Sequence, residues 1–368
     1  MFPAAPDGPL DELDDAPEDD FDDEPEPAPA ARTWPAGERP VHLDEHGRPR
    51  IIERRIEVEA DYDGWRTDLY LKRCIPRLSR TRIQGIIRDW LVGPGGRTLK
   101  ASSPVRAGDV LVVKREARSE PPFPRHFDVL VDEPTFLVVD KPANLPVHAS
   151  ARYYYGTLTR LMDERFPGQE LQIAHRIDRE TSGCLVVARG RAAAATLKGA
   201  FEKRKVSKVY QALVHGTPEW PEGHVIDLPL ALAPKERSAL GIRMEPAPGR
   251  PDGLTAQTRV KVVERFEGGA RVECRPITGR QHQIRAHLAA VGHPIIGDKL
   301  YAHGDEAFRR YCHRQETMSE SELIAEFGLA RQALHAAAIT FPHPTTGAPF
   351  TVECPLAADM KGYIQGRA

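Results

Sequence analysis

The sequence predicts an α+β fold in which a large domain with a mostly antiparallel sheet follows a smaller basic module. Short Val-rich segments bounded by Gly and Pro occur from residue 127 onward, for example 127–133, 135–142 and 183–189, and they predict strands. Helical runs lie among these segments without regular strand–helix alternation, which disfavours a parallel sheet. A chain of 368 residues has room for one large domain and one smaller one.

Residues 1–50 are predicted to form a disordered, acidic, Pro-rich tail. Residues 1–30 hold twelve acidic side chains and no basic one, and they have few large apolar side chains to offset the entropy of ordering. A tail of this kind usually only solvates the chain, and weak competition with nucleic acid is the alternative. The remaining 338 residues carry 51 basic and 41 acidic side chains, a formal charge of +10. This excess suits a phosphate backbone, although an ordinary solvated surface explains it equally well.

The segment 51–118 is predicted to be a compact basic module. Apolar residues at helical spacing end at Pro76, and Ser79 can cap a second short helix that closes at Leu91 and Val92. A Gly-rich turn and two short strands, at 103–105 and 110–113, should follow. Residues 60–118 carry 13 basic and 6 acidic side chains. Such a module should lie along a phosphate backbone. The arginines expected to contact RNA are Arg73, Arg80 and Arg82.

A linker is expected at 119–127, which is rich in Pro and charge, and the large domain then spans 128–368. Its expected helices lie near 157–165, 192–201 and 281–291. The five cysteines are scattered and form no CxxC pair, and no run approaches the roughly 18 apolar residues of a membrane span. A soluble protein without a disulfide framework, in the reducing cytoplasm, is therefore expected.

Asp178 lies between two arginines in the segment HRIDRETSG, directly ahead of an apolar strand. Catalytic groups are often found on such loops, and Gly183 can take the backbone angles that a sharp entry into the strand requires. On local spacing alone, however, a capping or turn role is the commoner explanation for such an Asp.

The segment ITGRQHQIRAHLAAVGHP predicts a helix that Thr278 could cap. Ile284 and Leu288 lie on its buried stripe, and Arg285 is next to that stripe. A partly buried arginine needs an anionic partner, which could be a structural acid or Asp178. The histidines of this segment lack the HExxH spacing, so no metal site is expected.

The strand KVSKVYQALVHG places Lys208 and Tyr210 on one face, because side chains alternate along a strand. A tyrosine on this face could stack on an extruded base or orient a proton transfer. Taken alone, however, a tyrosine in a strand is more often explained by simple packing.

Together these segments resemble the RluA-type pseudouridine synthases, and the basic module resembles the RNA-binding module named after ribosomal small-subunit protein four, here called S-four-like. The resemblance covers about residues 60–358 and rests on five ordered motifs: LVVDKPANLPVH, HRIDRETSG, KVSKVYQALVHG, PITGRQHQIRAHLAAVGHPIIGDKLY and LHAAAITFPHPTTG. It implies that Asp178 is the catalytic carboxylate, Tyr210 lies against the target base, and Arg285 pairs with the carboxylate. It also implies that Arg176 fills the space left by the flipped nucleotide.

The resemblance further implies the conversion of uridine to pseudouridine in RNA, which involves no net redox change and requires no cofactor. Ribosomal RNA of the large subunit is favoured over transfer RNA as the partner, Arg179 and Lys208 are expected to contact it, and the chain is expected to be a monomer. The sequence departs from the family in the aromatic segment ASARYYYGTLTRL and in the long charged segment 303–330. Both departures bear on the choice of substrate.

Two other classes of protein fit parts of the sequence. A non-catalytic RNA-binding or ribosome-assembly protein would need only the basic module. A hydrolase of glycosidic bonds usually has two carboxylates flanking the bond, whereas the motif around Asp178 offers only Glu180 as a further acid. The products of a reaction with RNA distinguish these classes, because unchanged RNA, an abasic site and pseudouridine are chemically different.

Overall fold

The computed structural model describes residues 40–44, 46–76, 78–149 and 153–367. They form two compact units that meet in the sequence between Glu120 and Pro121, and each unit is described by itself. Most of the expected tail, residues 1–39 and 45, lies outside the described residues. The part of residues 40–50 that is described forms a turn closed by an isolated bridge between Leu43 and Pro49.

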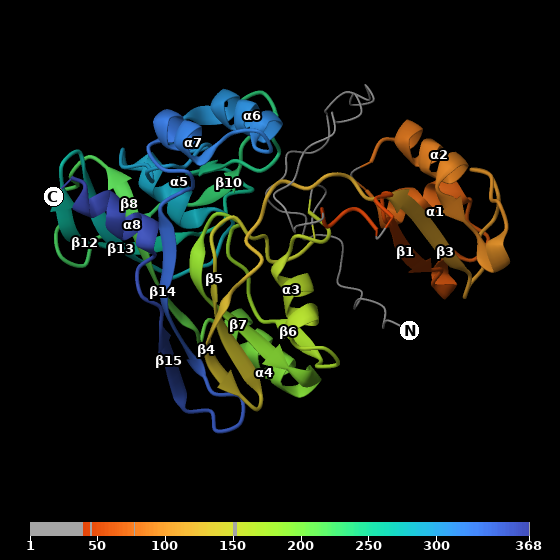
Figure 1. The fold of residues 1–368 in the computed structure, drawn as a ribbon, viewed down its shortest axis with the longest axis horizontal. Helices are drawn as coiled ribbons and strands as arrows, with labels where there is room; N and C mark the ends of the chain where they lie inside the picture. Colours follow the sequence, from red (N-terminus) through yellow and green to blue (C-terminus); the bar gives the residue numbers. More distant parts are fainter. Residues whose placement is uncertain (1–39, 45, 77, 150–152, 368) are drawn as a thin grey trace. The chain divides into compact units, whose positions relative to one another are not determined.

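The first unit packs two helices against a three-stranded antiparallel sheet of order β1-β3-β2 (Figure 1). Its elements are β1 (Ile51–Glu57), a 3-10 turn (Ala60–Tyr62), α1 (Thr67–Cys74), α2 (Arg80–Asp89), β2 (Leu91–Val92), a second 3-10 turn (Pro94–Gly96) and β3 (Val110–Glu116). The hydroxyl of Ser79 caps α2 by accepting the backbone N–H of Arg82 at 3.2 Å, as the sequence predicts. Leu71, Ile83 and Leu111 are fully buried between the helices and the sheet.

Two local predictions for this unit were wrong. Leu91 and Val92 do not close α2, because the helix ends at Asp89 and these residues pair with Val113 and Val112 of β3. Residues 103–105 do not form a strand, and Pro104 makes only an isolated bridge with Arg66. Both errors arise because strand pairing depends on partners that are distant in the sequence.

The second unit is built on a ten-stranded sheet of order β4-β5-β7-β14-β8-β13-β12-β9, with β15 paired to β14 and β6 to β7. Only β7 and β14 run parallel among the described strand pairs of this sheet, so the prediction of a largely antiparallel sheet is confirmed. The strands are β4 (Asp128–Glu133), β5 (Phe136–Lys141), β6 (Leu171–Ile173), β7 (Ser182–Arg189), β8 (Ser207–His215), β9 (Val225–Asp227), β12 (Gln257–Phe266), β13 (Gly269–Pro276), β14 (Leu334–Pro342) and β15 (Pro349–Glu353). A separate two-stranded sheet joins β10 (Leu230–Leu232) and β11 (Met244–Pro246).

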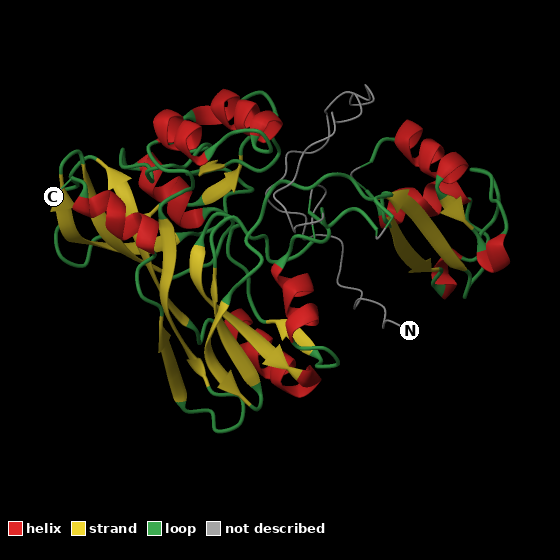
Figure 2. Cartoon of the chain, in the orientation of Figure 1, coloured by secondary structure: helices red, strands yellow, loops and turns green. Residues whose placement is uncertain are grey.

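Helices cover this unit at several places (Figure 2). They are α3 (Leu158–Arg165), α4 (Gly190–Glu202), α5 (Gln283–Ala290), α6 (Gly304–Arg314), α7 (Glu320–Phe327) and α8 (Ala358–Gln365). The first three confirm the helices predicted near 157–165, 192–201 and 281–291. The charged segment 303–330, for which the sequence predicted no structure, forms α6 and α7.

The central strands have continuous apolar sequences because hydrophobic clusters cover both faces of the sheet. Along β5, Leu137 and Val139 face one hydrophobic cluster, whereas Phe136 and Val138 face another on the opposite side. Phe127 also belongs to the first cluster and is buried, although it lies in the segment expected to be a linker.

Gly183, at the start of β7, allows the loop that carries Asp178 to reach the sheet. Its φ angle is +107°, and a Cβ at this position would collide with the backbone carbonyl of Ala336 in β14. The pairing of His335 with Ser182 and of Ala336 with Gly183 forms the parallel contact of the sheet. The Thr-Ser-Gly sequence therefore fixes where the loop 174–181 ends and β7 begins.

Candidate active site

Asp178 and Arg285, which are 107 residues apart, form an ion pair. Arg285 lies in α5 and donates Nη1–H to Oδ2 of Asp178 at 2.9 Å. The Asp178 side chain is 23% exposed, whereas that of Arg285 is 7% exposed. The carboxylate is therefore open to a ligand on one side and held from behind by a buried cation.

Arg285 also binds a second carboxylate, that of Asp298. Its Nε donates to Oδ2 of Asp298 at 2.8 Å, and its Nη2 donates to Oδ1 at 3.2 Å. Asp298 is fully buried and also accepts the backbone N–H groups of Leu300 and Tyr301 at 3.0 Å each. Burial opposes the charge of Arg285, but Asp298 and Asp178 outweigh it and raise its pKa. The sequence left open a structural acid or Asp178 as the partner, and the structure provides both.

Gln332 is a site residue that the sequence did not indicate. Its Nε2 donates to Oδ2 of Asp178 at 3.3 Å and to the hydroxyl of Thr181 at 2.8 Å. Gln332 and Thr181 are both buried, and the glutamine lies two residues before the start of β14. No local pattern marks it, because it acts through a residue 154 positions away.

Tyr210 of β8 completes the group of residues brought together at this site. The ring is 8% exposed and packs in the main hydrophobic cluster of the second unit. Burial, followed by the charge of Asp178, raises the pKa of Tyr210, so its hydroxyl remains protonated at neutral pH. Within the described part of the chain this hydroxyl makes no hydrogen bond, and it is available to a ligand.

Glu180 is close to Asp178 in the sequence but is fully occupied by structural contacts. Lys299 donates to its Oε2 at 2.9 Å, and Arg179 donates to its Oε1 at 2.9 Å. Burial opposes ionisation, but Lys299 and then Arg179 lower the pKa of Glu180 to about 2. A buried, paired carboxylate cannot flank a scissile bond as the glycosidic hydrolase alternative requires.

Arg179 does not lie where an RNA contact would be expected. Its side chain is only 15% exposed, and its guanidinium donates to the hydroxyls of Tyr153 and Tyr311 at 2.5 and 2.6 Å. The sequence analysis expected Arg179 to contact RNA, but its guanidinium is buried among hydrogen-bond acceptors of the protein itself. Arg176, two residues before Asp178, is exposed.

Lys208 shares a strand face with Tyr210 and is half-buried. A Cβ at Gly279 would lie 3.5 Å from its Nζ, which places the ammonium beside the loop that leads into α5. The charge of Lys208 also acts, after burial, to lower the pKa of His175 to about 3. The lysine therefore lies near both the 174–181 loop and the 277–282 loop.

The start of α5 differs from the sequence prediction. The helix begins at Gln283, and the residue before it is His282 with a left-handed φ of 49°. Thr278 does not cap the helix, since its hydroxyl donates to Oε1 of Gln283 at 2.7 Å and accepts the N–H of Gln257. His282 is buried against Tyr301, with Nδ1 3.2 Å from the Tyr301 hydroxyl.

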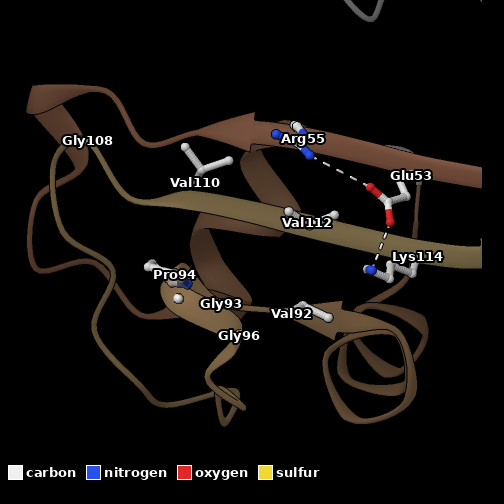
Figure 3. Close-up of a pocket in the computed structure, with 11 residues that line it drawn as sticks. Glu53, Arg55, Val92, Gly93, Pro94, Gly96, Gly108, Val110, Val112 and Lys114 are labelled. Carbon is white, nitrogen blue, oxygen red and sulfur yellow. Dashed lines mark ion pairs between the residues drawn. The ribbon is translucent and has the colours of Figure 1, made fainter. Parts of the chain in front are cut away.

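Arg73, Arg80 and Arg82, in the helical part of the first unit, are exposed. On its sheet, a hollow of about 520 Å³ is lined by Glu53, Arg55 and Lys114, by the valines Val92, Val110 and Val112, and by glycines of the 93–96 turn and Gly108 (Figure 3). Glu53 pairs there with Lys114 at 2.8 Å and with Arg55 at 4.0 Å, so the charged residues of this hollow carry one net positive charge.

The described ranges contain neither a metal-binding cluster nor a helix that could span a membrane. No group of three or more His, Cys, Asp or Glu side chains that could hold a metal ion occurs there. No helix of the same ranges is long and apolar enough to cross a membrane.

Comparisons with known proteins agree with this fold and geometry. The family model described as RNA pseudouridylate synthase matches residues 135–290, which include Asp178, Tyr210 and Arg285. Proteins called "Ribosomal large subunit pseudouridine synthase C" from Vibrio vulnificus (strain CMCP6) and Escherichia coli (strain K12) are each 32% identical over 323 residues, covering 84% of this chain and 95% of the relative. The human structure "RNA Pseudouridylate Synthase Domain Containing 1" is 25% identical and has a TM-score of 0.50. It covers 66% of this chain and 90% of its own.

The fold and the relatives define an enzyme that modifies RNA. The chain belongs to the RNA pseudouridine synthase family of the RluA type, and it is an isomerase that acts on uridine in RNA. The resemblance inferred from the five motifs is confirmed, and nothing favours a non-catalytic RNA-binding protein.

Proposed function

We propose that Asp178 is the catalytic carboxylate of this isomerase. The carboxylate is the partly exposed member of a network whose other members, Arg285 and Asp298, are buried. The reaction breaks the bond between ribose and nitrogen 1 of uracil, turns the base, and rejoins it through carbon 5. A carboxylate in this position can attack the sugar or remove a proton from it.

Arg285 supports either role by holding the carboxylate in place. The guanidinium is fixed by two bonds to buried Asp298, which leaves Nη1 directed at Oδ2 of Asp178. An arginine fixed in this way needs no reorganisation when charge moves during the reaction. Gln332 adds a second, neutral donor to the same oxygen of Asp178. Oδ1 of Asp178 makes no side-chain hydrogen bond with the described residues, and it is the atom proposed to face the sugar.

Tyr210 is proposed to contact the extruded base. Arg176 is proposed to fill the space that the extruded nucleotide leaves in the RNA. The charge of Asp178 acts on Tyr210, which places the tyrosine near the carboxylate. A base brought to Asp178 would therefore meet the Tyr210 ring. Arg176 is exposed and precedes Asp178 by two residues, so its side chain can insert between the stacked bases of the RNA. Stacking and insertion of this kind offset an unstacking cost of a few kcal/mol.

The proposed substrate is ribosomal RNA of the large subunit. The two bacterial relatives are called ribosomal large subunit pseudouridine synthases, and each is covered over 95% of its length. The first unit is proposed to be an S-four-like RNA-binding module, because Arg73, Arg80 and Arg82 in its helical part are exposed to solvent.

Mapping of pseudouridine in total RNA tests this substrate. RNA from cells with and without the protein should differ at one or a few uridines of large-subunit ribosomal RNA. A difference confined to transfer RNA would contradict the proposed substrate but leave the isomerase activity intact.

We further propose that Lys208 contacts a phosphate of the bound RNA. Its ammonium makes no hydrogen bond or ion pair with the described residues, and burial lowers its pKa. A half-buried cation without an acidic partner is costly, and an RNA phosphate beside the target nucleotide would compensate it.

Replacement of Lys208 by Met, which keeps an apolar stem but removes the charge, should weaken RNA binding. We expect the slope of log affinity against log salt to fall by about one, because one phosphate contact is lost. The matched control is Lys261→Met, which removes an exposed lysine from β12. Filter-binding titrations at several salt concentrations measure both slopes. Equal slopes for the two variants would show that Lys208 does not contact a phosphate.

A further inference from the structure

The loop that carries Asp178 is held by a segment far along the chain, residues 298–332. Asp298 fixes Arg285, Lys299 binds Glu180, and Gln332 binds Asp178 and Thr181. This segment also contains α6 and α7, the charged region in which the sequence departs from its family. The contacts of Arg179 show what these helices add.

Arg179, the neighbour of Asp178, is enclosed by four hydrogen-bond acceptors. Nη1 donates to the hydroxyl of Tyr153 at 2.5 Å and to Oε1 of Gln315 at 2.7 Å. Nη2 donates to the hydroxyl of Tyr311 at 2.6 Å and to Glu180 at 2.9 Å. The guanidinium carbon also lies 5.6 Å from the centre of each tyrosine ring, within the range of a cation–π contact.

Tyr311 belongs to α6, and this helix is itself firmly anchored. Asp305 accepts Nη1–H of Arg243 at 2.6 Å, and Phe308 and Tyr311 are buried in a cluster that also contains Tyr301. The centre of the Tyr311 ring also lies 4.9 Å from Nζ of Lys299, which binds Glu180. Burial raises the pKa of Tyr311, so the phenol remains neutral.

We infer that Tyr311 is a positioning residue for this isomerase: through Arg179 it fixes the backbone that presents Asp178 to the ribose. This inference rests on the proposed role of Asp178. The peptide bond between residues 178 and 179 lies between two anchored side chains, one held by Arg285 and Gln332 and the other by Tyr311 and its partners. A displacement of the carboxylate by about 1 Å can lower turnover about 100-fold, even when substrate still binds.

The contacts of Tyr311 give the charged segment 303–330 a structural function that is separate from substrate choice. The helices α6 and α7 are joined by ion pairs of Arg310 with Glu326 at 3.6 Å and of Arg314 with Glu322 at 3.7 Å. Arg310, Arg314 and Glu322 are exposed, whereas the rings of Tyr311 and Phe327 lie against the ammonium of Lys299. This pair of helices supports the catalytic loop from behind.

The test compares Tyr311→Leu with Phe308→Leu in the full-length protein. Both substitutions remove a buried ring from the same helix and the same cluster, but only Tyr311 contacts Arg179. Single-turnover rates, RNA affinity and melting temperature are measured for each variant. We expect the Tyr311→Leu rate at saturating RNA to fall about 100-fold, with RNA affinity unchanged within about threefold. Phe308→Leu should lower the melting temperature but keep the rate within about threefold.

A second variant keeps the inference testable if Tyr311→Leu does not fold. Tyr153→Phe combined with Tyr311→Phe keeps both rings and removes only the hydroxyls that bind Arg179. Its rate should fall at least tenfold, while Tyr311→Phe alone should lose less. Wild-type rates in folded Tyr311→Leu or in the double variant, or equal losses for Phe308→Leu and Tyr311→Leu, would overturn the inference. Wild-type turnover by a folded Asp178→Asn protein would instead overturn the proposed role of Asp178, on which the inference rests.

Discussion

Asp178→Asn should abolish turnover while leaving RNA binding almost unchanged. The amide keeps the size of the carboxylate and can still accept a bond from Arg285, but it cannot act as a nucleophile or base. We expect the single-turnover rate to fall by several orders of magnitude and RNA affinity to stay within about tenfold, because binding rests on basic and stacking groups. Release of tritium from carbon 5 of labelled uridine measures the rate, and filter binding measures the affinity.

The matched control for this prediction is Asp163→Asn, which removes an exposed carboxylate from α3 of the same unit. It should turn over at the wild-type rate. Substantial tritium release by a folded Asp178→Asn protein would eliminate Asp178 as the catalytic group. A joint loss of folding and binding would instead indicate that Asp178 is a structural turn residue.

Substitutions of Arg285 should impair both turnover and stability. Arg285→Ala leaves Asp298 buried without its cation, and breaking a buried pair in this way costs about 3–5 kcal/mol of unfolding free energy. Arg285→Lys keeps a positive charge but cannot bind Asp298 with two donors and Asp178 with a third. We expect the lysine variant to fold and to turn over at least about 100-fold more slowly, since Asp178 is then misplaced.

Arg250→Lys is the control for Arg285→Lys, because it also removes a bidentate arginine–carboxylate ion pair. Arg250 binds Asp252 through Nε at 3.0 Å and Nη2 at 2.7 Å, outside the network around Asp178. This variant should keep wild-type turnover. Chemical denaturation and single-turnover kinetics, applied to all three variants, separate stability from rate. Near-normal rates for Arg285→Lys would show that the arginine only stabilises the fold.

The sequence indicated which residues lie close to Asp178 better than it indicated the residues that surround them. Asp178, Tyr210 and Arg285 lie in motifs whose local spacing is informative, and the structure brings them together. The need of Arg285 for an anion followed from its place beside a buried stripe. The identity of the second anion, Asp298, did not, because it depends on how a loop after α5 folds back onto the helix.

Contacts between distant residues account for what the sequence could not predict. Arg179 was expected to contact RNA, yet it donates hydrogen bonds to Tyr153 and Tyr311, both distant in the sequence, and its side chain is largely buried. The segment 303–330 was considered only a charged departure from the family. Its capping box, in which Ser319 and Glu322 bind each other's backbone N–H groups, is a local signal for the start of α7 that was available in the sequence.

Analysis of the nucleosides formed from ribosomal RNA tests the central claim most directly. Purified full-length protein is incubated with an unmodified large-subunit ribosomal RNA transcript, without added metal or cofactor, and the RNA is digested and separated by chromatography with mass detection. We expect a new nucleoside with the mass of uridine and the retention of pseudouridine, formed by the wild type and absent with Asp178→Asn. Abasic sites, or RNA that is bound but remains chemically unchanged, would contradict it.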